Sequence, residues 1–83
     1  MKPAHPIRIL LVEDDELFRL GLQTRLQQEK CLQIIAEAED GETAVELTQE
    51  HLPDVVVLDI GLPGIGGIEA CRQIKQQLQK FPY

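Results

Sequence analysis

Three short runs of apolar residues along the chain predict buried β-strands. They cover residues 7–12, 32–38 and 55–60. The first and third runs are nearly continuous in isoleucine, leucine and valine, which is typical of parallel strands that are buried on both faces. The second run is more polar, and such a pattern suits a strand at the edge of a sheet.

Each apolar run is followed by a segment in which apolar residues recur at helical spacing. These segments predict helices over residues 15–29, 42–51 and 66–79. In the first helix the apolar face consists of Phe18, Gly21, Leu22 and Leu26. In the last helix the expected apolar stripe consists of Ile68, Cys71, Ile74 and Leu78.

The alternation of strand and helix, repeated three times with short connections, predicts an α/β fold of three βα units. Right-handed crossovers place helices on both faces of a parallel sheet, which gives three layers. In a doubly wound sheet the chain moves one way from its first strand and then reverses, so the expected spatial order is 2-1-3. The first and third strands are therefore neighbours.

Acidic residues follow both of these neighbouring strands. Glu13 and Asp14 come directly after the first strand, and Asp59 ends the third. Ligands of open α/β sheets bind outside the carboxyl ends of the strands, so we expect these three acids to share one crevice. Two simpler explanations stay open: Asp14 or Asp15 caps the first helix, and Asp59 only marks where the chain leaves the core.

Three carboxylates in one crevice repel one another unless a cation or a proton joins them. Mg²⁺ suits such a site, because it takes few protein carboxylates and keeps several waters or phosphate oxygens. The expected metal ligands are Glu13, Asp14, Asp59 and the backbone carbonyl of Gly61. A carboxylate beside Mg²⁺ can also act as a nucleophile towards a phosphoryl donor.

Composition narrows the remaining classes of function. With 83 residues the chain forms one small domain, and its net charge of −6 gives no basic surface for a nucleic acid. No apolar run reaches the roughly 18 residues of a membrane span, and no secretory signal is present, so we expect a cytoplasmic protein without a membrane partner. Cys31 and Cys71 match no metal or redox spacing and are expected as reduced thiols.

The acidic motifs together resemble a CheY-like response-regulator receiver domain of two-component signalling. They are Glu13-Asp14 after an apolar strand, Asp40-Gly41 followed by Ala44, and Asp59 followed by Leu62-Pro63-Gly64 and Gly67. The stretches 17–22 and 36–41 further resemble receivers that carry a LuxR-type output domain for transcription regulation. The resemblance covers residues 7–79 and implies a flavodoxin-like fold.

The resemblance also implies a role for each site residue. Asp59 would be the phosphoacceptor, which receives a phosphoryl group from a sensor histidine kinase. Asp14 would bind Mg²⁺ directly, Glu13 mainly through water, and Gly61 through its carbonyl oxygen. Such a domain is a signalling module, and we do not expect an enzyme.

A receiver of this family has five βα units, whereas this sequence stops after the third, so we expect a truncated receiver. The family's hydroxyl residue after the fourth strand, and the lysine and aromatic switch residue of the fifth, have no counterpart among these residues. The third strand would then have an uncovered edge, which is a template for pairing with another chain. We therefore expect self-association.

Three other functions are alternatives to phosphoryl acceptance. A phosphatase of the haloacid-dehalogenase type needs a second aspartate two positions after the first, where this chain has Gly61. A phosphate-binding loop needs a Gly-Lys-Ser/Thr ending or a Gly-x-Gly-x-x-Gly pattern, and residues 61–67 contain neither. The third alternative, a phosphorylation-incompetent module for dimerisation or kinase docking, stays open.

Overall fold

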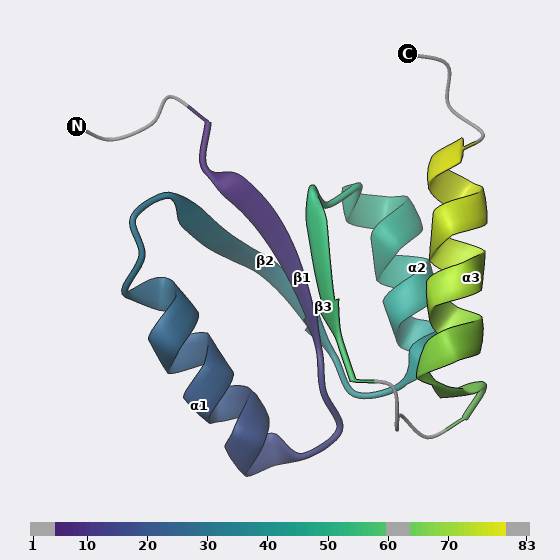
Figure 1. Cartoon of the computed structure of the whole chain (residues 1–83), viewed down its shortest axis with the longest axis horizontal. Coiled ribbons are helices and arrows are strands. Elements are labelled where there is room, and N and C mark those ends of the chain that lie inside the picture. Colours follow the sequence, from purple (N-terminus) through teal and green to yellow (C-terminus); the bar gives the residue numbers. More distant parts are fainter. Residues whose placement is uncertain (1–4, 60–63, 80–83) are drawn as a thin grey trace.

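The computed structural model describes residues 5–59 and 64–79 of the chain. In chain order the elements are β1 Ile7–Val12, α1 Glu16–Gln27, β2 Leu32–Ala38, α2 Gly41–His51, β3 Val55–Leu58 and α3 Gly66–Gln79. Helix α1 covers one face of the sheet, and α2 and α3 lie side by side on the other (Figure 1). The three-layer α/β arrangement is thereby confirmed.

The strands form one parallel sheet in the order β2-β1-β3, as the sequence predicts. The central strand β1 pairs Val12 with Ala38 on one side and with Leu58 on the other. Strand β3 ends at Leu58, so the expected range 55–60 is too long; Ile60 lies outside the described residues. The chain leaves the ladder at Asp59, whose N–H still donates to the carbonyl oxygen of Val12 at 3.2 Å.

The core forms around β1, whose side chains are buried on both faces. Leu10 and Val12 pack into a cluster on the side of α2 and α3. Its other buried members are Ala38, Ala44, Val45, Ala70 and Ile74. Because side chains alternate along a strand, the equally buried Ile9 and Leu11 face the α1 side. Burial on both faces explains the continuous apolar run of residues 9–12.

Helix α1 begins at Glu16 and ends at Gln27, inside the expected range 15–29. Asp15 has an extended backbone (φ −79°, ψ 114°), and its carboxylate accepts a 2.9 Å hydrogen bond from the N–H of Phe18. Asp15 is therefore the N-cap and not the first helical residue. Over its whole length α1 has no fully buried residue, and Phe18 is 56% exposed, so its apolar face is only partly covered.

Helix α2 begins at Gly41, one residue before the expected range 42–51. Asp40 caps it by accepting a 2.7 Å hydrogen bond from the N–H of Thr43. A Cβ atom on Gly41 would come within 2.7 Å of Ile65 Cγ1 and 3.2 Å of Ala70 Cβ. Only glycine fits where the start of α2 meets the start of α3, which explains the Asp-Gly pair.

The buried face of α3 differs from the predicted stripe. Gly67, Ala70 and Ile74 are buried, whereas Ile68 is 73% exposed and Cys71 is exposed. The side chain of Leu78 lies outside the described part. The predicted stripe is right at Ile74 and wrong at Ile68 and Cys71, because the close approach of Gly41 to Ala70 favours a small residue on the buried face, while hydropathy alone selects the large ones. Both cysteines are free thiols.

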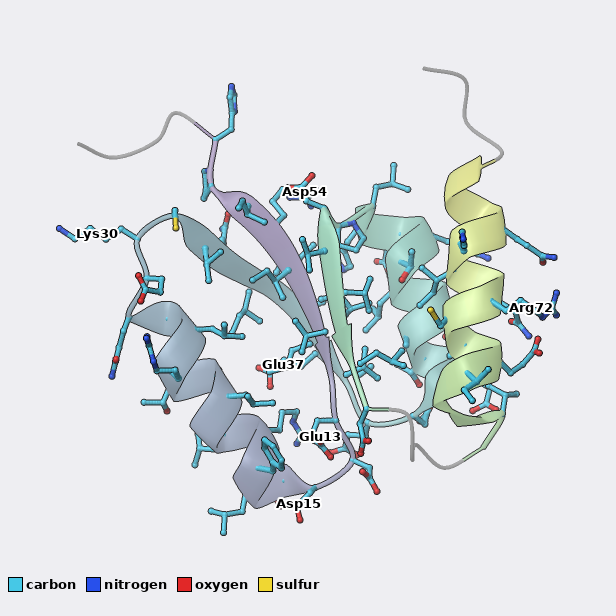
Figure 2. All side chains as sticks on the ribbon, in the orientation of Figure 1. Glu13, Asp15, Lys30, Glu37, Asp54 and Arg72 are labelled. Atoms are coloured by element: carbon cyan, nitrogen blue, oxygen red, sulfur yellow. The ribbon has the colours of Figure 1, made fainter. Side chains whose placement is uncertain are left out.

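Charged side chains gather at both ends of the sheet (Figure 2). Glu13 and Asp15 lie at the carboxyl end of the strands, and Lys30 and Asp54 lie at the opposite end. Within the described ranges, no helix has the length and apolar character needed to cross a bilayer.

Candidate metal centre

The acids of the candidate site are positioned by the backbone of the sheet. Glu13 follows β1 and donates its N–H to the carbonyl oxygen of Ala38 at 3.0 Å. Asp59 follows β3 and donates its N–H to Val12 at 3.2 Å. Since Val12 and Leu58 are partners in the parallel register, the residues that follow them come out side by side.

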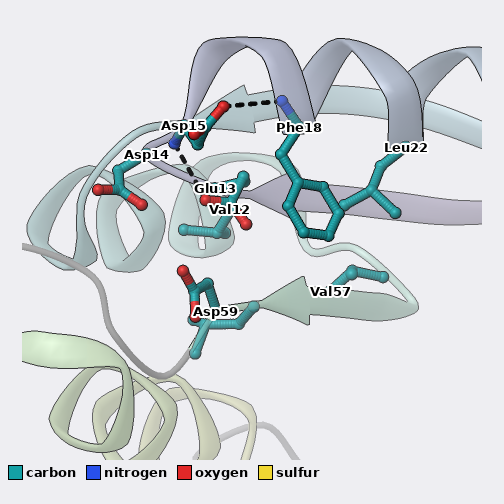
Figure 3. Close-up of a pocket in the computed structure, with 9 residues that line it drawn as sticks. Val12, Glu13, Asp14, Asp15, Phe18, Leu22, Val57 and Asp59 are labelled. Atoms are coloured by element: carbon teal, nitrogen blue, oxygen red, sulfur yellow. Dashed lines mark hydrogen bonds between the residues drawn. The ribbon is translucent and has the colours of Figure 1, made fainter.

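The structure brings together three of the four expected ligands. One carboxylate oxygen from each of Glu13, Asp14 and Asp59 lies within 4.8 Å of the others, and these three residues are named the carboxylate cluster here. Glu13 is only 6% exposed, Asp59 is half-buried and Asp14 is exposed. Figure 3 shows Asp59 facing the other two across the gap between the strand ends. Gly61 lies outside the described residues.

The carboxylate cluster opens into a cavity of about 530 Å³. Its lining consists of Val12, Glu13, Asp14, Asp15, Phe18, Leu22, Val57, Leu58 and Asp59. The acids thus lie at one end, beside apolar side chains from α1 and β3 (Figure 3). The cavity is open to solvent, so a small anionic group and its counterion have access to Asp59.

Asp15 contributes to this region through its backbone. Its N–H donates a 3.0 Å hydrogen bond to Glu13 Oε2, while its carboxylate is engaged at the start of α1. Of the two acids proposed as caps, Asp15 caps the helix and Asp14 belongs to the carboxylate cluster. The acids 13–15 thus divide between a helix cap and the site, and Glu16 lies in the first turn of α1.

The donor set fits a hard divalent cation. Carboxylate oxygens are the preferred protein ligands of Mg²⁺, which completes its octahedron with water or phosphate oxygens. Three carboxylates this close repel one another in the absence of a cation, and the burial of Glu13 strengthens that repulsion. A bound Mg²⁺ would remove it and would neutralise charge on a phosphoryl group beside Asp59.

The sequence predicts neither of two further contacts, one at Glu13 of the site and one in the connection between β3 and α3. Arg19 donates a 2.7 Å hydrogen bond from its guanidinium to the carbonyl oxygen of Glu13. Glu42 accepts a 2.7 Å hydrogen bond from the N–H of Ile65, in the connection between β3 and α3. Helical periodicity places both side chains on polar faces and gives no signal of these tertiary contacts.

Residues 9–83 match the family model of the response regulator receiver domain. The chain belongs to this family. Receiver domains are signalling domains of two-component systems, interact with histidine kinases, and bind Mg²⁺ at an acidic site. In this chain the acidic group is the carboxylate cluster.

Individual relatives agree with the family match. The transcriptional regulatory protein DegU of Brevibacillus brevis is 40% identical over 76 residues, which are 92% of this chain and 31% of the relative. A LuxR-family response regulator from Aurantimonas sp. SI85-9A1 has 42% identity and a TM-score of 0.82, with 86% of this chain and 51% of that chain covered. This likeness agrees with the LuxR-type resemblance of residues 17–22.

A third similar chain comes from the solved structure of a complex. In the CheX-CheY-BeF3-Mg²⁺ complex from Borrelia burgdorferi, the matching chain has 32% identity and a TM-score of 0.73, with 87% of this chain and 55% of that chain covered. The present chain spans about a third of the length of the curated relatives it matches and about half of the solved chains.

Proposed function

We propose that this chain accepts a phosphoryl group on Asp59 from a sensor histidine kinase, with Mg²⁺ as cofactor. The observation that carries the proposal is the convergence of the Glu13, Asp14 and Asp59 carboxylates within 4.8 Å at the ends of two adjacent strands. A reactive carboxylate needs nearby groups that hold a cation, and Glu13 and Asp14 are in place to do so.

Each residue of the proposed site has its own task. An oxygen of Asp59 forms a bond to phosphorus as the phosphorus–nitrogen bond of a phosphohistidine donor breaks, and the donor imidazole keeps the electron pair. Asp14 would hold Mg²⁺ directly, the more buried Glu13 through water, and Gly61 through its carbonyl oxygen. A solved relative is part of a CheX-CheY complex that includes Mg²⁺ and BeF3, which supports Mg²⁺ as the cofactor of this site.

The wider role follows from the relatives. DegU is a transcriptional regulatory protein, and this chain covers 31% of it. We propose that residues 1–83 are the N-terminal part of a receiver domain whose fourth and fifth βα units lie outside them, and that the regulator acts on transcription in the cytoplasm. This segment would bind no nucleic acid itself, given its charge of −6.

The proposal is tested by intact mass spectrometry after incubation with acetyl phosphate. The original chain is expected to gain one phosphoryl group in the presence of Mg²⁺ and none with a chelator. Asp59→Asn is expected to gain none under either condition. Asp54→Asn is the matched control, because Asp54 lies at the opposite end of the sheet (Figure 2), and it is expected to be labelled like the original chain.

A second candidate function, self-association or docking, rests on the outer side of β3. Among the described residues β3 pairs only with β1. A groove of about 490 Å³ runs between β3 and α3, and we name it the β3–α3 groove. Its lining consists of Val56, Leu58, Gly67, Ile68, Cys71, Arg72 and Lys75. An unpaired strand edge beside an apolar groove favours pairing with a second strand.

We propose that a second copy of this chain covers the β3–α3 groove when these 83 residues are studied alone. Sedimentation equilibrium of the chain is expected to show a dimer, and Ile68→Glu, which puts a charge into the groove, is expected to shift it to monomer. A monomer at all concentrations would contradict the proposal. Pull-down of a histidine kinase by an Asp59→Asn dimer would favour docking without phosphorylation.

A further inference from the structure

Arg19 links Glu13, a member of the carboxylate cluster, to helix α1 and to the end of strand β2. Although Arg19 belongs to α1, its side chain is only 14% exposed. One guanidinium nitrogen donates to the carbonyl oxygen of Glu13 at 2.7 Å, and another lies 3.0 Å from Glu39 Oε1. The Nε atom lies 3.4 Å from Glu37 Oε1. A single side chain thus joins α1, the end of β1 and the end of β2.

Together these contacts fix Glu13 from several directions. Its N–H is held by Ala38, its carbonyl oxygen by Arg19, and its carboxylate by the N–H of Asp15. The peptide that follows Glu13 leads directly to Asp14. The orientation of the Glu13 carbonyl therefore sets the direction in which the chain presents the Asp14 carboxylate.

The two glutamates orient the guanidinium. Arginine presents its donors in a rigid planar fork, so partners on one side restrict where the remaining N–H groups point. Glu37 and Glu39 lie on β2 and just after it, and their negative charge compensates Arg19 inside the α1 layer. Figure 2 shows Glu37 between α1 and the sheet.

We propose that Arg19 is a positioning residue for the carboxylate cluster. Its guanidinium, oriented by Glu37 and Glu39, holds the Glu13 carbonyl so that the carboxylates of Glu13 and Asp14 face Asp59. The identity of the bound ion, Mg²⁺, rests on the proposed function, whereas the positioning of Glu13 does not.

Arg19→Gln is compared with Arg25→Gln in two measurements. Arg25 is the matched control, because it lies on the same helix and forms an exposed ion pair with Glu29 at 3.0 Å. The first measurement is the affinity for Mg²⁺ by isothermal titration calorimetry. Loss of a residue that orients a metal ligand typically weakens binding by about 10- to 100-fold, and we expect that loss for Arg19→Gln and none for Arg25→Gln.

The second measurement is amide hydrogen exchange without metal. The N–H of Asp15 reports on Glu13, because it donates to the Glu13 carboxylate at 3.0 Å. The N–H of Thr43, held by Asp40 at 2.7 Å, reports on the general stability of the fold. Arg19→Gln is expected to speed exchange at Asp15 while exchange at Thr43 stays as in the original chain.

The outcomes separate this inference from the proposed function. Equal acceleration at Asp15 and Thr43 would show a merely structural role and overturn the inference, as would unchanged exchange at both. If the original chain binds no Mg²⁺, the proposed function fails, and the exchange comparison alone decides the role of Arg19. If Arg19→Gln does not fold, Glu39→Gln replaces it, since Glu39 is 69% exposed, with a smaller change expected in the same direction.

Discussion

The N–H of Asp59 donates a hydrogen bond of 3.2 Å to the carbonyl oxygen of Val12. This contact continues the β1–β3 ladder one step beyond the last paired residues and places Asp59 beside Glu13. The spacing of the carboxylates is thus set by the register of a parallel sheet. A register shift of one residue would turn their side chains to opposite faces, so the site and the fold depend on the same pairing.

Mg²⁺ is expected to stabilise the folded chain, because binding to the native state alone raises the free energy of unfolding. At a Mg²⁺ concentration one hundred times Kd the gain is about 2.7 kcal/mol. Asp14→Asn removes a proposed direct ligand and is expected to lose most of this gain. Thermal unfolding with and without Mg²⁺ checks it.

Glu16→Gln is the control for this measurement, because Glu16 is exposed in the first turn of α1 and lies outside the carboxylate cluster. It is expected to keep the Mg²⁺ stabilisation. An equal gain for Asp14→Asn and the original chain would show that Asp14 does not bind the ion.

Gly41→Ala is expected to destabilise the fold by about 1–3 kcal/mol, the usual cost of overpacking. The new methyl group would come within 2.7 Å of Ile65 Cγ1, where α2 and α3 meet. Gly21→Ala is the opposite case, since within the described residues no heavy atom other than those of its chain neighbours and its own helix backbone lies within 4 Å of its Cβ position. There the change is expected to stabilise α1 by about 0.5–1 kcal/mol.

Urea unfolding of both alanine variants checks this pair. Opposite signs are expected for the two changes in the free energy of unfolding. Similar stability of Gly41→Ala and the original chain would mean that the start of α2 does not pack against Ile65 as described.

The order of the elements could be predicted from the sequence, because the apolar runs of β1 and β3 differ in period from the segments between them. The identity of the buried residues of α3 could not be predicted from the sequence. Ala70 is buried where the backbone of Gly41 approaches it closely, and such a tertiary fit leaves no mark in hydropathy. Ile68 is the opposite case: its hydropathy predicts burial, but its side chain is exposed in the structure.

The candidate site likewise has a part that the sequence predicts and a part that it does not. The meeting of Glu13, Asp14 and Asp59 follows from strand order, which the sequence pattern and the crossover rule supply together. The contacts of Arg19 with Glu13 and Glu39 depend on where α1 lies across the sheet, and no sequence spacing encodes that placement. Gly61 remains a predicted ligand, outside the described residues.

Asp40 is expected to make stability depend on pH in the acid range. Hydrogen bonds from Thr43 hold the pKa of its carboxyl below the usual value of 3.8. The charged form is therefore favoured by folding, and its contribution is present above pH 3.8 and is lost as the pH falls through the lower folded pKa. Asp40→Asn removes this charge and keeps an acceptor at the cap.

Urea unfolding of the original chain and Asp40→Asn between pH 7 and pH 2 checks the prediction. The original chain is expected to be the more stable at neutral pH, and the difference is expected to shrink below about pH 4. A difference that stays constant over this range would mean that the charge of Asp40 does not contribute.

Mapping the modified residue tests whether Asp59 itself carries the phosphoryl group. The chain is treated with acetyl phosphate and Mg²⁺, the acyl phosphate is reduced with borohydride to the alcohol, and peptides are sequenced by mass spectrometry. We expect homoserine at position 59, and only when Mg²⁺ was present. Reduction at Asp14 or Asp54 instead, or equal modification without Mg²⁺, would contradict this expectation.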